Sequence, residues 1–511
     1  RPAMKIERTK NANRNIVFGS ILKVYQMLIP FLMRTAMIYF MGVQYLGLNS
    51  LFTSVLQVLN LAELGVGSAM VYSMYKPIAE DDTVTICALM NLYKKYYRII
   101  GLIIALLGLI LTPFIPYLIK DEIPGELNIY VLYLLNLSAT VFSYWLFAYK
   151  NCILQAYQRT DIVSKITIIT STLQYGTQIL VLMVLKNYYY YVIAALLIQI
   201  LNNIVTAVVS NWLFPEYNAK GSLEKKEVAS INQKIKDLFT AKLGSVITSS
   251  ADTLIISSFL GLVDLAIYQN YYFILTAITG FMSVLFSSIT AGMGNSFVCE
   301  TEEKNYHLFE KITFMTAWII SICCCCFACL YQHFMKLWVG AQYLLGDLFV
   351  YLIVCFFAVS HIRQLWCTVK DAAGIWHEDR FRPFVSSIVN LILSLVLVKV
   401  IGLYGVISAS IVSCVFIGWP WLISNIFNMI YKGSPRKYIL HILKYMFAIG
   451  ASIAISSFIC AQISIESISG LIIKGVVAVL VAIILWSILF HKNYYYKDTL
   501  NYIKNLRKVG R

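Results

Sequence analysis

A succession of apolar runs, each about 20 residues long, covers most of this 511-residue chain and constrains its fold more than any other feature. At about 1.5 Å per helical residue, such a run matches the hydrocarbon thickness of a bilayer. Unpaired backbone amides are not tolerated there, so each run is expected to be a helix. Fourteen spans are predicted, at about 16–40, 46–74, 99–119, 128–148, 162–185, 191–213, 241–260, 265–297, 312–331, 347–369, 383–401, 405–430, 442–462 and 470–490.

The composition agrees with this reading. Hydrophobic residues make up 59% of the chain and charged residues only 13%, whereas about a quarter of the residues in soluble domains are charged. The mean hydropathy is +0.73. The predicted fold class is therefore an all-α polytopic membrane protein of about 14 transmembrane helices, with no room for a separate soluble domain.

Lys and Arg are distributed unevenly between alternate connecting segments. With the N-terminus placed in the cytoplasm, 33 of the 41 basic residues fall on the cytoplasmic side. Positive residues collect on that side of membrane proteins, so both termini are predicted to be cytoplasmic, and the net charge of +16 reflects topology rather than nucleic-acid binding. The opposite side carries only five: Lys120, Lys186, Lys336, Lys399 and Lys474.

The longest polar stretch, 215–240, follows the sixth span and divides the chain. An apolar stripe at helical spacing predicts an interfacial amphipathic linker helix, with a solvated linker as the alternative; the stripe comprises Val228, Ile231, Ile235 and Leu238. The predicted divisions are an N-terminal lobe of spans one to six over 1–214, the linker over 215–240, a C-terminal lobe of spans seven to twelve over 241–431, peripheral spans thirteen and fourteen over 432–490, and a basic cytoplasmic tail over 491–511.

An internal repeat accompanies this division. Lys23 precedes Gly42 by nineteen residues, and Lys242 precedes Gly261 by the same interval. Both segments start on the same side in the predicted topology, so the two six-helix lobes would form a parallel pseudo-repeat with two appended C-terminal helices.

Five ionisable residues inside the spans are the candidate site residues: Lys23, Arg34, Glu63, Asp252 and Arg363. Each is costly in hydrocarbon, so such residues usually face a protein interior or a water-filled cavity. Lys23 and Arg34 are eleven residues apart and share one helix face, which suggests a track for an anionic substrate. Glu63 and Asp252 would carry a coupling cation or balance charge. The alternatives are snorkelling for the three basic residues and a fixed internal ion pair for the two acids.

Other residue patterns do not indicate a site. The run Cys323–Cys326 points in four directions around a helix and cannot converge on one ion, so no metal is expected. Tyrosines at 96–97, 188–191 and 494–496 lie at predicted span ends and are interpreted as aromatic belts. No HExxH, GxSxG or GxxxxGK[ST] pattern occurs, so the protein is expected not to be an enzyme.

Several stretches resemble Wzx-type polysaccharide flippases of the multidrug/oligosaccharidyl-lipid/polysaccharide exporter (MOP) superfamily. They are NANRNIVFGSILKVYQMLIPFLMRT, YFMGVQYLGLNSLF, ADTLIISSFLGLVDLAIYQNYY, KDAAGIWHEDRFRP and, most specifically, AELGVGSAMVYSMYKP. The resemblance implies two six-helix lobes around a central cavity, in a bacterial cytoplasmic membrane. It also implies a substrate, an oligosaccharide on polyprenyl pyrophosphate, and partners such as membrane lipids and the polymerase and glycosyltransferases of the same pathway.

The leading hypothesis is a flippase that works by alternating access, with substrate contacts from Lys23, Arg34 and Arg363. No cofactor is expected, apart from a coupling cation, a proton or sodium. The first alternative is a multidrug or organic cation antiporter on the same fold, which would prefer an acidic, aromatic cavity. The second is a membrane-embedded glycosyltransferase or polymerase.

Overall fold

The computed structural model describes residues 8–509 except 64, 121–122, 124–126 and 376, and some side chains within helices, including those of 242 and 502–509, lie outside the described set. Across the described residues every regular element is helical. Eleven helices are long and apolar enough to span a membrane, or twelve if the bent pair Ile129–Trp145 and Ala148–Ala156 is one span. The protein is therefore an all-helical, multi-pass membrane protein, as predicted.

The count of fourteen spans remains a prediction. The predicted spans at 46–74 and 241–260 fall on α2–η1–α3 and on the C-terminal part of α9, and neither is among the eleven or twelve. The first is divided into pieces too short to span alone. The second continues a polar helix.

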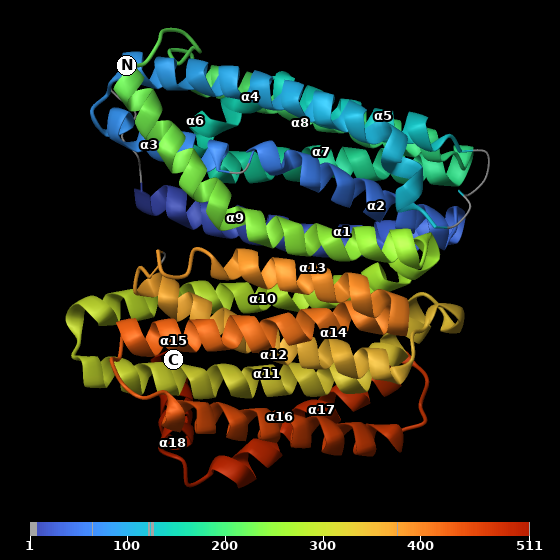
Figure 1. The fold of residues 1–511 in the computed structure, drawn as a ribbon, viewed down its shortest axis with the longest axis vertical. Coiled ribbons are helices and arrows are strands. Elements are labelled where there is room, and N and C mark those ends of the chain that lie inside the picture. The colour runs from blue at the N-terminus through green and yellow to red at the C-terminus, as the bar shows by residue number, and fades with distance from the viewer. Residues whose placement is uncertain (1–7, 64, 121–122, 124–126, 376, 510–511) are drawn as a thin grey trace. The chain divides into compact units, whose positions relative to one another are not determined.

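The chain divides into two compact units, 1–266 and 267–511 (Figure 1). The first contains α1 (Arg8–Phe40), α2 (Val43–Leu59), η1 (Asn60–Glu63), α3 (Val66–Ala79), α4 (Thr83–Leu111), η2 (Thr112–Leu118), α5 (Ile129–Trp145), η3 (Ala148–Lys150), α6 (Asn151–Ala156), α7 (Thr160–Leu180), η4 (Val181–Leu185), α8 (Tyr188–Leu213) and α9 (Lys225–Phe259). The second contains most of α10 (Leu262–Cys299), then α11 (Glu302–Trp338), η5 (Ala341–Tyr343), α12 (Asp347–Ala372), α13 (Arg382–Ile401), α14 (Leu403–Ser413), η6 (Cys414–Gly418), α15 (Trp419–Met429), α16 (Arg436–Ala461), α17 (Ile468–Phe490) and α18 (Tyr494–Val509).

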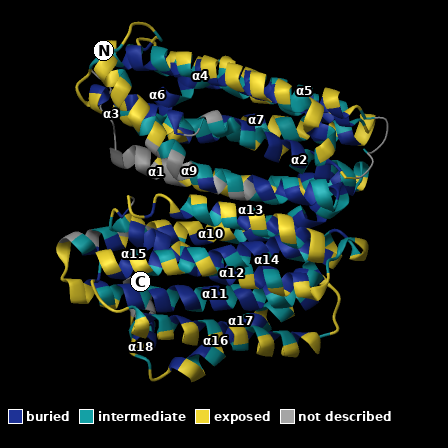
Figure 2. Ribbon diagram, in the orientation of Figure 1, coloured by how far each residue is buried: buried dark blue, intermediate teal, exposed yellow. Residues whose placement is uncertain are grey.

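Exposed residues run along the helices of both units (Figure 2). Many of them are large and apolar, for example Leu107 and Ile110 on α4 and Phe447 on α16. A contiguous apolar exterior of this kind is unfavourable in water and favourable in lipid. The burial pattern therefore agrees with a bilayer as the solvent.

Helix α9 runs from the predicted linker into the predicted seventh span without a break at residue 240. Its apolar stripe contacts protein: Ile231 is buried, and Leu238 lies against Gly65. Polar residues beside the stripe add contacts, because the Tyr96 hydroxyl donates to Asn232 Oδ1 over 2.6 Å. The position of this helix at a membrane surface stays a prediction.

The predicted repeat has a structural counterpart at two helix ends. Gly42 ends α1 with φ +112° and Gly261 ends α9 with φ +111°. Each glycine donates its amide to a carbonyl five residues back, Met37 in one case and Ile256 in the other. Positive φ is accessible to glycine without strain, which explains the residue at both positions. The side chain of Lys242 lies outside the described residues.

A second similarity between the two units lies at the starts of α7 and α13. Asp161 is fully buried and paired with Arg159 at 2.9 Å and Lys165 at 3.5 Å. Asp379 is likewise buried, and it pairs with Arg382 at 2.7 Å and Lys370 at 3.2 Å. Each unit thus holds one aspartate between an arginine and a lysine at the corresponding turn.

The close contact between α2 and the start of α10 yields a stability prediction. A Cβ added at Gly47 would lie 2.1 Å from the carbonyl oxygen of Leu262, a backbone atom that cannot rotate away. We expect Gly47→Ala to destabilise the protein by about 1–3 kcal/mol, since overpacking costs this much. The measurement is the apparent melting temperature in detergent. Gly176→Ala is the control, because nothing lies within 4 Å of its added Cβ; equal melting temperatures for the two variants would contradict this packing.

Candidate functional site

Two interrupted helices meet at one place in the first unit. The first interruption lies between α2 and α3, where Gly65 has φ +89° and where an added Cβ would lie 2.7 Å from Leu238 Cβ on α9. The second lies between α5 and α6, which bend by 47° at Phe147 with φ +62°. Irregular backbone within a membrane is tolerated only where protein or a cavity receives its polar groups. Interrupted helices therefore mark the places in such folds where sites form.

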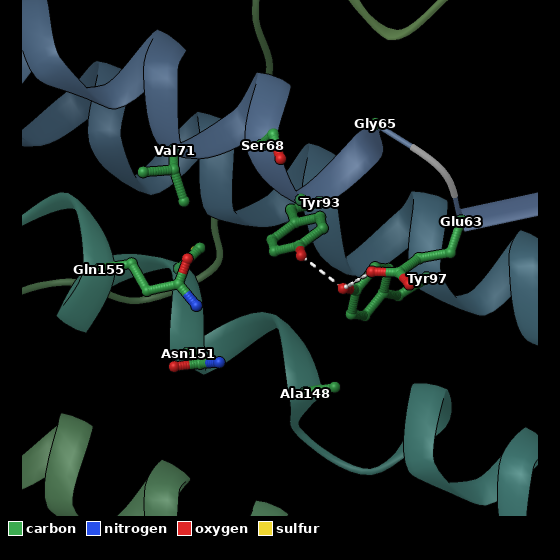
Figure 3. Close-up of a pocket in the computed structure, with 11 residues that line it drawn as sticks. Glu63, Gly65, Ser68, Val71, Tyr93, Tyr97, Ala148, Asn151 and Gln155 are labelled. Atoms are coloured by element: carbon green, nitrogen blue, oxygen red, sulfur yellow. Dashed lines mark hydrogen bonds between the residues drawn. The ribbon is translucent and has the colours of Figure 1, made fainter. Parts of the chain in front are cut away.

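Glu63 stands at the first interruption and accepts hydrogen bonds from two tyrosines. The Tyr97 hydroxyl donates to Oε1 over 2.9 Å, and the Tyr144 hydroxyl donates to Oε2 over 3.3 Å. The Tyr93 hydroxyl donates in turn to Tyr97 over 2.5 Å, which completes a chain of hydroxyls ending on the carboxylate (Figure 3). Both donors are neutral hydroxyls, so these hydrogen bonds give Glu63 partners that carry no positive charge.

The chain of tyrosine hydroxyls explains one of the two glycines in the ELGVGSA motif. A Cβ at Gly67 would lie only 3.0 Å from the Tyr93 hydroxyl and 3.8 Å from Glu63 Oε1. Glycine at this position therefore leaves room for the hydroxyl chain. Gly65 supplies the positive φ and the close approach to α9. The stretch AELGVGSAMVYSMYKP, which carries the most specific family resemblance in the sequence, thus supplies residues that line the site.

A pocket of about 270 Å³ opens beside the carboxylate. Its wall includes Ser68, Asn151 and Gln155 as well as Glu63 and the tyrosines (Figure 3). The buried Asn151 Oδ1 receives no hydrogen bond from the described residues, and Glu63 forms no ion pair with any of them. The pocket is acidic, aromatic and rich in acceptors, an arrangement that suits a positively charged ligand.

The two predicted basic residues of the first unit lie on α1, which is continuous through Pro30. Lys23 is exposed, whereas Arg34 is half-buried, with its Nη2 atom buried and its charge close to Tyr191 of α8. They are about 16 Å apart along the helix axis at 1.5 Å per residue. Neither is among the described residues that line the Glu63 pocket.

The remaining candidates lie on other helices. Asp252 is half-buried on α9, with its Oδ1 atom buried, and is not among the described residues lining the Glu63 pocket. Arg363 belongs to the second unit, on α12, where it contacts η6: a Cβ on Gly418 would lie 2.9 Å from its Cδ atom. The structure thus places Glu63 in a defined pocket but does not bring the five predicted residues into one cluster.

Sequence reasoning missed the tyrosines of the site. Tyr97 was interpreted as an aromatic belt residue, yet it is buried and bonded to Glu63. Tyr188 and Tyr191 are also buried, and their rings stack with centroids 5.8 Å apart. The belt interpretation was therefore wrong for these three. The spacing of Tyr93 and Tyr97, one helical turn apart on a helix with Lys94 and Lys95, was the only available signal, and it is shared by many belt residues.

No protein-family model matches the sequence, and no curated protein matches it either. The fold, however, is similar to that of a lipid II flippase and of a MATE family transporter of the MOP superfamily. The likeness lies in the arrangement of the helices along most of the chain.

The individual structures are as follows. The lipid II flippase MurJ, in an inward closed conformation, is similar with a TM-score of 0.68 at 15% identity, and the match covers 93% of this chain and 99% of that one. An inward-facing MATE family multidrug resistance transporter of the MOP superfamily has a TM-score of 0.60 at 13% identity, over 79% of this chain and 97% of that one. An outward-facing MATE structure has a TM-score of 0.51 at 13% identity, over 80% and 94%.

The tyrosine contacts of Glu63 yield a second prediction. Tyr97→Phe removes a donor to a carboxylate and the acceptor of Tyr93, and we expect a loss of about 2 kcal/mol in stability. Tyr144→Phe should cost less, because its bond is longer, at 3.3 Å. The apparent melting temperature measures both. Tyr117→Phe is the control, since its side chain is 79% exposed; a Tyr97→Phe variant as stable as this control would show that the hydroxyl chain contributes nothing.

Proposed function

We propose that this protein is a flippase that moves a polyprenyl-pyrophosphate-linked oligosaccharide from the cytoplasmic to the outer face of a bacterial cytoplasmic membrane by alternating access. The observation that carries the proposal is the fold likeness to a lipid II flippase over 93% of the chain. The MATE structure accounts for less of the chain, 79%. The resemblance of ELGVGSA and its flanks to Wzx-type flippases adds support.

The charges in the spans give the proposal its chemistry. A pyrophosphate and its glycan cannot cross hydrocarbon unaided, because removing charged and polar groups from water costs many times the thermal energy. Lys23, Arg34 and Arg363 would attract the anionic headgroup at successive depths. The prenyl chain would stay in lipid throughout. Partners expected on this proposal are membrane lipids and the polymerase and glycosyltransferases of the same pathway, with both termini of the chain in the cytoplasm.

A coupling cation, a proton or sodium, would drive the cycle through Glu63 or Asp252. The pocket around Glu63 supports this assignment, because its negative charge is held by neutral tyrosine donors and is not paired with a described basic residue. Binding of either cation there would neutralise the charge, and a proton would in addition let the carboxyl group donate to a tyrosine oxygen. No organic cofactor is proposed.

Transport of a labelled lipid-linked oligosaccharide in proteoliposomes tests the function. We expect Arg34→Ala and Arg363→Ala each to slow flipping about tenfold or more, since each removes an interaction worth about 1.4 kcal/mol or more to the moving anion. Lys399→Ala, which changes an exposed cation on α13, is the control. Unaltered rates in both arginine variants, with melting temperatures unchanged, would refute the anion track.

A second candidate function is a multidrug or organic cation antiporter. The acidic, aromatic pocket at Glu63 favours it specifically, because cations bind carboxylates and aromatic faces. Binding of tetraphenylphosphonium to the purified protein, abolished by Glu63→Gln, would support it. Flipping of the glycolipid with no such binding would support the flippase.

A further inference from the structure

A groove of about 420 Å³ runs along the second unit between α13 and the η6–α15 segment. Val385 forms one wall, and Phe416, Ile417 and Pro420 form the other. The Phe416 ring is 70% exposed. An apolar groove between membrane-spanning helices is chemically suited to a lipid chain. The question is which lipid it selects.

The backbone of the groove wall is irregular. Residues 414–418 form one turn of π-helix, and Pro420 follows two residues later with no amide hydrogen to donate. Such turns widen a helix and concentrate at functional sites. Here the wider turn carries Phe416 and Ile417 to the groove and places Gly418 beside Arg363 on α12.

The groove ends in polar groups. Ser424 and Asn425 line it, and the buried Asn425 Nδ2 has no acceptor within the described portion of the chain. A buried donor without an acceptor costs about 1–3 kcal/mol, so a ligand oxygen at this point would be stabilising. Trp421 also lines this polar end of the groove. Its Nε1 donates to the Glu378 carbonyl over 3.4 Å and so connects the groove to the α12–α13 loop.

Two arginines stand near the groove. Arg380, two residues beyond Glu378, is exposed and lies over the Phe381 ring at 4.7 Å. Arg363 lies behind the groove wall, where its Cδ atom would be 2.9 Å from a Cβ on Gly418. A side chain on Gly418 would therefore displace Arg363. Because Gly418 has no side chain, the aliphatic part of the Arg363 side chain approaches the π-helical turn, whose neighbouring residues line the groove.

Apolar contact alone cannot select an occupant here, because lipid tails are as apolar as the groove and no hydrophobic gain distinguishes one chain from another. Selection must come from the headgroup. A pyrophosphate diester carries more negative charge than the phosphodiester of a phospholipid, so the Arg380 guanidinium and the Asn425 amide donor favour it.

We propose that this groove holds the isoprenoid chain of a polyprenyl pyrophosphate, with the pyrophosphate near Arg380 and Asn425. The inference rests on the proposed function, because it names where the lipid part of the substrate is held. It assigns the groove to the substrate lipid and not to bulk phospholipid.

Photocrosslinking from inside the groove tests this. A benzophenone-bearing phenylalanine replaces Phe416 in one variant and Phe447 in another, an α16 residue that is 73% exposed and thus matched in lipid contact. The reconstituted proteins are irradiated with radiolabelled polyprenyl pyrophosphate without a glycan, or with radiolabelled phosphatidylglycerol. We expect the pyrophosphate-to-phospholipid labelling ratio at 416 to exceed that at 447 by about fivefold or more, a difference of about 1 kcal/mol.

Further variants test whether contacts to the headgroup or the apolar groove itself determine the labelling. Arg380→Ala and Asn425→Ala in the 416 photoprobe protein should bring the ratio to that at 447, whereas Arg436→Ala, an exposed cation on α16, should not. Val385→Trp should lower labelling by both lipids, because it fills the groove.

Equal ratios at 416 and 447 would show an ordinary lipid site and overturn the inference, even if glycolipid flipping proceeds. Enriched labelling with no glycolipid flipping would overturn the proposed function and leave the groove assignment intact.

Discussion

Hydrocarbon offers no water to bond a free amide or carbonyl, and this constraint governs the whole chain. It makes nearly every described residue of the spans helical, and it makes each interruption of a helix informative. Two interruptions, at η1 and at η3, meet around Glu63. A third, the wide turn at η6, lies between Arg363 and the apolar groove. At these three places the irregular backbone lies beside charged or polar side chains.

Buried charges are handled in two ways. Asp161 and Asp379 are each held between an arginine and a lysine, an arrangement that stabilises a turn and leaves no negative charge for a ligand. Glu63 is held by neutral phenols instead. Its carboxylate therefore lines a pocket without a basic partner among the described residues.

Much of the fold followed from the sequence. The apolar runs predicted the helices. The matching intervals ending at Gly42 and Gly261 predicted a repeat, and both glycines end a helix in the same conformation. The site was predicted only in part. Glu63 was recognised as a charge out of place in an apolar run, but Tyr93, Tyr97 and Tyr144 come from two other helices and have ordinary surroundings in the sequence. The stripe on α9 was recognised as amphipathic, while its partner, Gly65, was not foreseeable from spacing.

The sequence by itself determined the solvent, the helical class and the short list of charges that the membrane makes costly, because these depend on composition and on local periodicity. Only the tertiary structure decided that Glu63 is held by tyrosines and that Arg363 lies beside the turn whose neighbouring residues line a groove. Contacts between distant segments make that decision. A carboxylate in an apolar run has the same local sequence whether its partner is a lysine or a phenol, so the difference appears only when the helices pack.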